Sequence, residues 1–502
     1  MPRAATAVVR EADTEFSLRD VVRRGADAHG DRIAAIEGET RVTYRRLAER
    51  TGALAAALRQ AGVGPGVQVA VMLSNAVSGI VWYYAVLEAG GIVVMLPSSL
   101  TGAEARDAIG GSGAWFVGAS SADALPSDLD VPLERCSAPD SEGGLWRVSR
   151  DLPRIDTVPW TPAGYMIRRT TSGSTGRPRH VFKTEANLAF DFATFGVTFG
   201  IDRSDVFLAV LPIYSPLGSY GFTLAIYHGA CVTLLPRFLP GAVLETARRD
   251  RATVFFASPA MIDALSTCVL GEGDAAALRG LKFCASGGAH LRRDVAEAFR
   301  ARFGVRVHNQ YGATESHTVA VDTDDPFVEG RVGRPLRGVE LRIVDDDEAP
   351  LPAGAIGRIA ARSPAAGTHY IGDPEGTAKV FRGGWVYPGD RGYLDPDGRL
   401  HVLGRDDLIN IDGMKVDPLE VARVIREALP VREVFVLAAD RAGLPALRAV
   451  VEADPARVTA KLVVEACRSR LSPHKVPMRV DVRDRLERTA TGKVLMSSLV
   501  PD

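Results

Sequence analysis

A run of hydroxyl and glycine residues in the first half of the chain has the composition of an anion-binding loop. Residues 170–176 read Thr-Thr-Ser-Gly-Ser-Thr-Gly and continue into Arg177, Pro178 and Arg179. Hydroxyls and backbone N–H groups can wrap an anion, and glycines let the chain approach it closely. The segment lacks the Lys-Ser/Thr that completes a Walker loop. A phosphate loop and a flexible surface loop therefore explain this segment, taken alone, equally well.

Further motifs downstream carry side chains that are common in catalysis. They are Asn-Gln-Tyr-Gly-Ala-Thr-Glu at 309–315, Gly-Trp-Val-Tyr-Pro-Gly-Asp at 384–390, Gly-Arg-Asp-Asp at 404–407 and Arg-Thr-Ala-Thr-Gly-Lys at 488–493. In this order the motifs resemble those of the adenylate-forming superfamily, which contains acyl-CoA synthetases, peptide-synthetase adenylation domains and luciferases. The resemblance runs from about residue 15 to residue 498. It implies an ATP-dependent acid–thiol ligase.

The resemblance implies a set of residues that bind ATP or AMP and CoA. The loop would hold the β- and γ-phosphates, Tyr311 would stack on adenine, and Asp390 would accept both ribose hydroxyls with its two oxygens. Gly413 would lie where the CoA arm enters. The full set is Thr171, Ser172, Gly173, Ser174, Thr175, Gly176, Arg179, Gly288, Ala289, Asn309, Tyr311, Gly312, Asp390, Arg405 and Gly413.

The resemblance also implies the catalytic residues. Thr314 would contact the α-phosphate, and Glu315 would hold Mg²⁺ with Thr175. Lys493 would bridge the attacking carboxylate and the α-phosphate as negative charge develops there. The chain has only seven lysines among its 60 basic residues, so a lysine at this position favours a function over an ordinary solvated turn.

Such enzymes form an acyl-adenylate and pyrophosphate, and a thiol then attacks the adenylate after the small domain rotates about an acidic hinge. Counting back from Gly413 places that hinge at Asp406. Asp406 and Asp407 are also what a turn between two domains would contain. The two interpretations are compatible.

Several positions depart from the family pattern. Arg179 replaces the usual lysine of the loop and is followed by His180, Ser215 replaces a usual histidine, and Pro388 removes a hydroxyl and a backbone donor. One residue is also missing after Arg405. Two alternatives to a complete ligase therefore stay open. One is a split enzyme that performs a single half-reaction or passes its adenylate to a carrier protein, and the other is a ligand-binding pseudoenzyme, against which the intact catalytic residues argue.

The expected acid pocket is apolar and lacks a partner for an ammonium group. Between residues 206 and 244 there is no Asp or Glu, so a free α-amino acid is a poor candidate substrate. The pattern favours an aryl, alicyclic or fatty acid, although aromatic residues at these spacings also suit core packing. The predicted pocket residues are Tyr214, Ser215, Gly218, Ser219, Tyr220, Phe256 and Gly287.

The elements that must position these residues alternate as in an α/β fold. We predict helices at 47–61 and 75–89 and strands at 67–73, 91–96, 206–211, 253–257, 281–285 and 305–308. Short strands follow at 339–344, 357–362 and 399–403, and then a helix at 417–429, strands at 434–437 and 447–451, a helix at 457–471 and a strand at 479–482. This pattern predicts a large N-terminal domain of layered α/β subdomains at 1–404, with an antiparallel β-rich module at about 335–404. A small mobile α+β C-terminal domain would occupy 405–502.

Composition restricts the partners and the compartment. Among 502 residues, 46% are hydrophobic, which is enough for a sizeable core. The 60 basic and 61 acidic residues leave no net field for nucleic acid or a membrane surface, so neither is expected as a partner. The odd, scattered set of five cysteines is typical of a reducing cytoplasm. The sequence leaves open whether the protein is a monomer or a homodimer.

Overall fold

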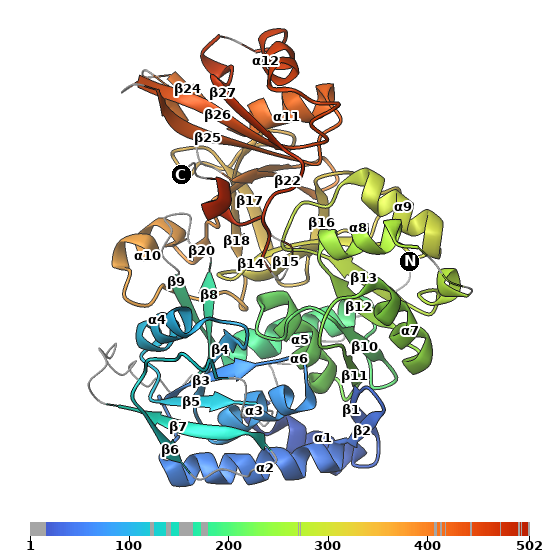
Figure 1. Cartoon of the computed structure of the whole chain (residues 1–502), viewed down its shortest axis with the longest axis vertical. Helices are drawn as coiled ribbons and strands as arrows, with labels where there is room; N and C mark the ends of the chain where they lie inside the picture. The colour runs from blue at the N-terminus through green and yellow to red at the C-terminus, as the bar shows by residue number, and fades with distance from the viewer. Residues whose placement is uncertain are drawn as a thin grey trace, which may run out of the picture. The chain divides into compact units, whose positions relative to one another are not determined.

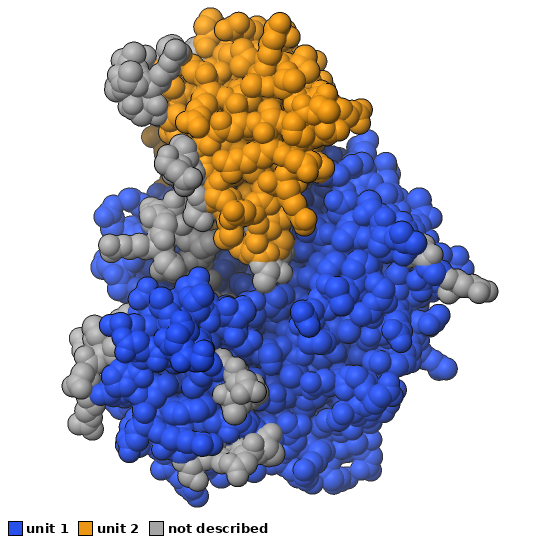
Figure 2. All heavy atoms as spheres, in the orientation of Figure 1, with its two compact units in different colours: residues 1–340, 361–386 blue, residues 341–360, 387–502 orange. Residues whose placement is uncertain are grey.

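The computed structural model divides into two compact units, which Figure 2 colours separately. Unit 1 comprises Met1–Glu340 and Ala361–Val386, and unit 2 comprises Leu341–Ala360 and Tyr387–Asp502. The structure describes residues 17–120, 125–136, 142–149, 164–171, 179–269, 271, 273–405, 409–411, 414–416, 418–441, 444–471, 473–489, 492 and 494–499. The predicted domain boundary after residue 404 falls within unit 2 and stays a prediction.

The first sheet of unit 1 has the strand order β6-β7-β5-β3-β4-β8-β9. Its four central strands run parallel, and β7 and β9 flank them in antiparallel pairings. Every residue of β3 is buried, as expected of a parallel strand covered on both faces. The strands are β3 (Gln68–Leu73), β4 (Ile92–Pro97), β5 (Phe116–Ala119), β6 (Leu133–Cys136), β7 (Gly144–Val148), β8 (Tyr165–Thr171) and β9 (Arg179–Thr184).

The second sheet of unit 1 is parallel from β1 through β11, β10, β12 and β13 to β14. Beyond β14 it continues antiparallel through β15 and β16, and β2 pairs antiparallel with β1 at the other edge. The strands are β1 (Ile33–Glu37), β2 (Thr40–Thr43), β10 (Val206–Ala209), β11 (Cys231–Leu234), β12 (Val254–Ala257), β13 (Phe283–Ser286), β14 (His308–Ala313), β15 (His317–Val321) and β16 (Arg331–Pro335). Residues 361–386 add the short hairpin β19 (Phe381–Arg382) and β20 (Trp385–Val386).

Helices cover these sheets, as Figure 1 shows. Helix α3 contacts β3 and β4 of the first sheet and β1 of the second, and ten of its residues are buried, which explains its lack of a polar face. Helix α6 packs against β10, β11 and β12. The helices of unit 1 are α1 (Val21–His29), α2 (Tyr44–Ala61), α3 (Val77–Glu88), α4 (Gly102–Ser112), α5 (Glu185–Phe199), α6 (Pro216–Tyr227), α7 (Pro240–Asp250), α8 (Pro259–Thr267), α9 (Arg293–Phe303) and α10 (Pro374–Val380), with 3-10 turns η1 (Leu18–Asp20) and η4 (Asp274–Ala276).

Unit 2 contains most of β17 and β18 and an α+β segment with its own core. Helices α11 and α12 pack on the sheet β25-β26-β27 through buried residues that include Val421, Ile425 and Val463. Its elements are β17 (Glu340–Val344), β18 (Gly357–Arg362), β21 (Asp390–Leu394), β22 (Leu400–Arg405), β23 (Ile409–Ile411), β24 (Met414–Val416), α11 (Pro418–Ala428), β25 (Glu433–Arg441), β26 (Leu444–Glu452), α12 (Ala460–Arg468), η5 (Pro473–Lys475), β27 (Arg479–Arg483) and η6 (Met496–Leu499).

The predicted α/β class and most predicted elements are confirmed, but the strand predicted at 305–308 is wrong in its position. Strand β14 begins at His308 and extends through the motif that the sequence placed in a loop. Asn309 and Gly312 look like loop residues, yet antiparallel pairing with β15 supplies hydrogen-bond partners for this backbone. Tyr311 therefore lies on a strand. Within the described residues, no helix has the length and apolarity needed to cross a bilayer.

Candidate functional site

Paired strands hold the two ends of the predicted phosphate loop. Thr171 at the end of β8 lies opposite Arg179 at the start of β9, and residues 172–178 between them lie outside the described part of the chain. Buried Arg168 anchors β8, because its guanidinium donates to Gln68 Oε1 at 3.1 Å and to Gly111 O at 2.8 Å. The loop thus begins and ends on a fixed hairpin.

Arg179 is tied to the segment around α10. Its Nε lies 3.0 Å from Asp373 Oδ2, and its guanidinium lies over the ring of Tyr370, 5.2 Å from the centroid. Asp373 also caps α10, since Oδ1 accepts from Gly376 N. Burial, assisted by the charge of Arg168, lowers the pKa of the neighbouring His180 to about 4, so this imidazole is neutral at pH 7. Of the two described residues at this end of the loop, Arg179 is therefore the one that supplies a positive charge.

The hairpin β14–β15 brings together five of the predicted ATP-site residues, namely Asn309, Tyr311, Gly312, Thr314 and Glu315. A Cβ at Gly312 would collide with the carbonyl oxygen of His317, so the turn requires glycine there. Ser316 Oγ accepts from Ala313 N at 3.2 Å and fixes the turn that carries Thr314 and Glu315. The Asn309 amide donates to Arg331 O at 2.9 Å, which gives that residue a structural contact as well.

Glu315 is buried and held by two residues that the sequence did not single out. The Tyr370 hydroxyl donates to Glu315 Oε1 at 2.5 Å. Burial, and then the charge of Glu315, raise the pKa of Tyr370, so the phenol keeps the proton that it donates. The fully buried Lys183 donates to Glu315 O and to Ala365 O, each at 2.9 Å. A lysine directly after the apolar pair Val181 and Phe182, in a chain with so few lysines, was a signal for this role.

The carboxylate of Glu315 suits the predicted Mg²⁺. In the described part of the chain, no group of three or more His, Cys, Asp or Glu side chains could hold a metal ion by itself. Mg²⁺ at phosphoryl-transfer sites is commonly held by one or two carboxylates together with the substrate phosphates. A single fixed carboxylate beside the hairpin that carries the predicted phosphate loop fits that arrangement.

The other predicted site residues are placed as follows. In unit 2, Asp390 at the start of β21 pairs across the strands with Arg405 at the end of β22. In unit 1, Gly288 has φ +84°, and Gly288 and Ala289 are exposed just after β13, at the carboxyl edge of the parallel strands where such sheets bind ligands. The side chain of Arg405, and Asp406, Gly413 and Lys493, lie outside the described residues.

Part of the predicted acid pocket borders a small apolar cavity of about 10 Å³, the size of one water-sized sphere. Its lining residues are Phe207, Leu208, Ala209, Val210, Leu211, Leu217, Gly218, Gly221 and Phe256. Tyr220 packs edge-on against Phe256 at 5.7 Å, within a larger aromatic cluster. Ser215 is the N-cap of α6, because its Oγ accepts from Gly218 N at 3.1 Å.

Two glycines, Gly218 and Gly221, line this cavity, and a larger side chain would have a different effect at each. The sequence suggests that Gly218 keeps space open for the acid, but a Cβ there would collide with the carbonyl oxygen of Pro212, so this glycine permits a close backbone approach. A Cβ at Gly221 would meet only Phe256 Cδ2 at 3.6 Å, an ordinary contact. A side chain added at Gly221 would therefore narrow the cavity without a backbone collision, so this position can be used to test the size of the pocket. At Gly287, another predicted pocket residue, an added Cβ would lie 2.7 Å from Gln310 Cγ.

We expect Gly221→Ala to lower kcat/KM for bulky acids by about tenfold or more and to leave short acids within about threefold of wild type. One added methyl group in a filled apolar pocket has an effect of that order, and alanine is a better helix former than glycine. Steady-state kinetics with one bulky and one short acid measure the effect. Gly218→Leu is the contrasting variant, and its loss should extend to all acids and to the melting temperature. An unchanged size profile in Gly221→Ala would remove this cavity from the acid pocket.

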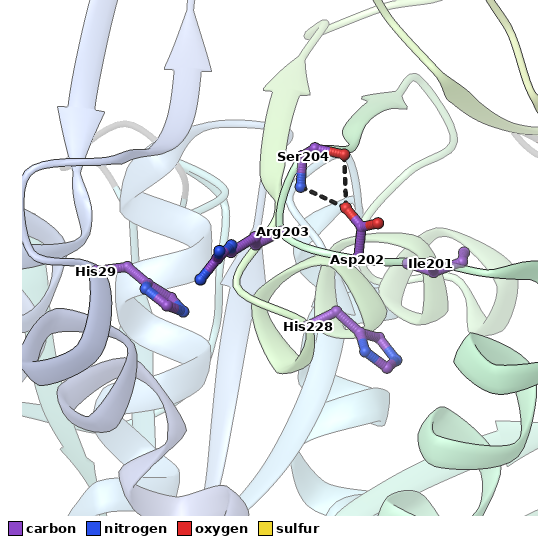
Figure 3. Close-up of a pocket in the computed structure, with 6 residues that line it drawn as sticks. All are labelled: His29, Ile201, Asp202, Arg203, Ser204 and His228. Atoms are coloured by element: carbon purple, nitrogen blue, oxygen red, sulfur yellow. Dashed lines mark hydrogen bonds between the residues drawn. The ribbon is translucent and has the colours of Figure 1, made fainter.

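A larger open hollow of about 490 Å³ lies near α1 and the loop before β10 (Figure 3). Three of its polar residues form contacts within the fold: Asp202 Oδ1 accepts from the backbone and hydroxyl of Ser204, and His228 Nε2 lies 3.1 Å from Phe192 O. His228 points away from His29 and Arg203. This hollow does not gather its groups around a common point.

Comparison with known proteins identifies the family. The family model described as "AMP-binding enzyme" matches residues 22–371, well over half of the chain. The chain belongs to the AMP-binding enzymes. This match confirms the adenylate-forming family and the enzyme class, an ATP-dependent acid–thiol ligase, that the motifs imply.

Individual AMP-binding enzymes resemble the chain over nearly its whole length. A feruloyl-CoA synthase of an Amycolatopsis species is 31% identical to this chain, and the match covers 92% of this chain and 94% of the synthase. The ATP-bound structure of MatB from Rhodopseudomonas palustris is 26% identical with a TM-score of 0.80, covering 96% of this chain and 98% of that one. An amide bond synthetase from Marinactinospora thermotolerans is 27% identical with a TM-score of 0.76, covering 96% and 99%.

Proposed function

We propose that this AMP-binding enzyme is an acyl-CoA ligase that activates a hydrophobic aryl, alicyclic or fatty carboxylic acid. The observation that carries the proposal is the 31% identity to a feruloyl-CoA synthase over 92% of the chain. The buried, doubly held Glu315 supports it, because a carboxylate fixed in this way suits phosphoryl chemistry. The test is pyrophosphate release that depends on ATP and acid and is followed by formation of a CoA ester.

In the first half-reaction, a carboxylate oxygen of the acid attacks the α-phosphorus of ATP, and the bond to the β-phosphate breaks to release pyrophosphate. Thr314 would contact the α-phosphate, and Lys493 would neutralise the charge that develops between carboxylate and phosphate. Bound Mg²⁺ would neutralise phosphate charge. Tyr370 and Lys183 keep the carboxylate and the backbone of Glu315 in place during this step.

In the second half-reaction, the CoA thiolate attacks the acyl carbonyl of the adenylate and AMP leaves. Gly413 would lie at the entry of the CoA arm, and Asp406 would be the hinge about which residues 405–502 turn between the two steps. A carrier protein is the alternative acceptor, and the arrangement assigns no oligomeric state. The five free cysteines suit a reducing compartment, for which we propose the cytoplasm.

We expect the enzyme to prefer an apolar acid over its α-amino counterpart by about 10³ in kcat/KM, which corresponds to about 4 kcal/mol. The cavity lining is apolar, and burying an ammonium group without a carboxylate partner costs on the order of several kcal/mol. The buried carboxylate of Asp191, outside the 206–244 segment, is already paired with His317. Kinetics with a matched pair, such as a phenylalkanoic acid and its α-amino derivative, measure the ratio. Comparable use of both acids would contradict an apolar pocket.

A further inference from the structure

A buried acid–base pair lies in unit 1 outside the catalytic residues described above. Asp191 on α5 and His317 at the start of β15 are joined by a 2.7 Å contact between Oδ2 and Nδ1. Their side chains are 2% and 6% exposed. The two residues are 126 positions apart, and neither the phosphate chemistry nor the thiol transfer uses them.

Two features of this pair work against stability. Removing a carboxylate and an imidazole from water is costly even when they are paired. His317 also has φ +63°, in the left-handed region where a residue with a Cβ is strained. Backbone strain of this kind tends to be retained at functional sites, so its presence two residues after Glu315 calls for a role.

The pair is next to the aromatic wall of the acid pocket. The ring of His317 packs edge-on against Tyr220 with 6.0 Å between centroids. Tyr220 in turn packs against Phe256, which lines the apolar cavity. The imidazole therefore lies at one end of an aromatic wall, two residues after Glu315 in the chain.

The contact with Asp191 determines what His317 can bind. Because Nδ1 is taken by Asp191, a ligand would meet the imidazole at Nε2. A hydroxyl group can donate to a neutral Nε2 or accept from a protonated one, so it suits either protonation state. A second carboxylate on the substrate suits the site less well, because Asp191 is already a buried carboxylate in contact with the imidazole, and a second buried anion beside it would be costly.

We propose that His317, held in place by Asp191, is a specificity determinant that binds a hydroxyl group on the hydrophobic body of the acid. The inference rests on the proposed function and narrows its substrate class to hydroxylated acids, with hydroxyaryl acids as the best fit to the aromatic wall. His317 would contact the substrate, and Asp191 would be its positioning residue.

Binding of acyl-sulfamoyl adenosines, stable analogues of the acyl-adenylate, tests this proposal without requiring turnover. The probes are the cinnamoyl compound and its ortho-, meta- and para-hydroxy derivatives, and calorimetry gives the Kd of each. We expect wild type to bind at least one hydroxylated analogue about tenfold or more tighter than the parent, as expected for one well-placed buried hydrogen bond.

The main variant is Asp191→Leu/His317→Gly, which removes both polar side chains together and places glycine at the positive φ. We expect it to bind the parent within about threefold of wild type and to lose the hydroxyl preference. Asp191→Asn should reduce the preference without abolishing binding of the parent. Asp250→Asn is the matched control: this carboxylate is also buried and paired, with Arg249 and Thr233 on α7 and β11, and its loss should leave the preference unchanged.

The outcomes separate this inference from the proposed function. Wild type that binds the parent analogue but favours no hydroxylated derivative overturns the role of His317 and leaves the ligase proposal standing. A preference that persists in the double variant overturns it as well. If wild type binds none of the four analogues, the preference for hydroxyaryl acids is wrong, and pyrophosphate release with a wider panel of acids decides the proposed function separately. Should the double variant fail to fold, Asp191→Asn decides, because an unchanged hydroxyl preference in that variant overturns the proposal.

Discussion

Replacing Lys493 with alanine is expected to lower the rate of acyl-adenylate formation by a factor of about 10² or more. The lysine would stabilise charge that is present mainly in the transition state, and removal of one such electrostatic donor has an effect of this order. Lys493 itself lies outside the described residues, which include Arg488, Gly492 and Val494 near it. Arg488 pairs with Val494 in an isolated bridge and contacts Glu452 Oε2 at 2.6 Å.

Acid-dependent pyrophosphate release measures this loss, and Lys461→Ala is the control. Lys461 is a highly exposed lysine of the same unit that faces Glu465 across one helical turn, so its replacement should leave the rate unchanged. Thiolation of a presynthesised acyl-adenylate should persist in Lys493→Ala. Pyrophosphate release at the wild-type rate would remove the lysine from the mechanism. Wild type that thiolates an adenylate but never releases pyrophosphate would favour the split enzyme.

Replacing Glu315 with glutamine is the second large effect, and we expect adenylation to fall by about 10² to 10³. The amide keeps the shape of the side chain and can still accept from Tyr370, so the fold should survive while the negative charge is lost. The Mg²⁺ concentration needed for half-maximal rate should rise as well. Tyr370→Phe removes only the hydrogen bond that orients the carboxylate, and we expect about a tenfold loss.

The control for the Glu315 series is Glu375→Gln, which changes an exposed carboxylate paired with Lys379 on α10. That variant should keep wild-type kinetics. Adenylation by Glu315→Gln at the wild-type rate, with an unchanged Mg²⁺ requirement, would contradict the role of Glu315. If Tyr370→Phe slowed adenylation while Glu315→Gln did not, Tyr370 would act through a group other than the Glu315 carboxylate.

Sequence patterns predicted the elements whose limits depend on neighbouring residues in the chain. The end of α2 at Gly62 follows from a left-handed φ of +103°, and β18 has the predicted bounds. Strand β14 was misplaced because its pairing with β15, and not its composition, makes it a strand. The motif residues on the β14–β15 hairpin lie together as the family resemblance implies.

The contacts that hold the site could not be predicted in the same way. Lys183 reaches Glu315 across 132 positions, Tyr370 reaches it across 55, and Asp191 meets His317 across 126. No local period encodes such pairs, and only the packing of α5, β9 and the hairpin brings them into contact. The scarcity of lysine and an aspartate between two phenylalanines at 190 and 192 were the available signals.

The central claim is that this AMP-binding enzyme couples adenylation of a hydrophobic acid to thioester formation with CoA. In the direct test, the protein is incubated with ATP, Mg²⁺, CoA and a panel of aryl, alicyclic and fatty acids. Pyrophosphate and the acyl-CoA product are then measured by mass spectrometry. We expect equal amounts of pyrophosphate and acyl-CoA for at least one acid. Pyrophosphate without a CoA ester, with the acyl group captured instead by an amine or a carrier protein, would contradict the assignment of CoA, and no acid-dependent pyrophosphate at all would contradict the ligase.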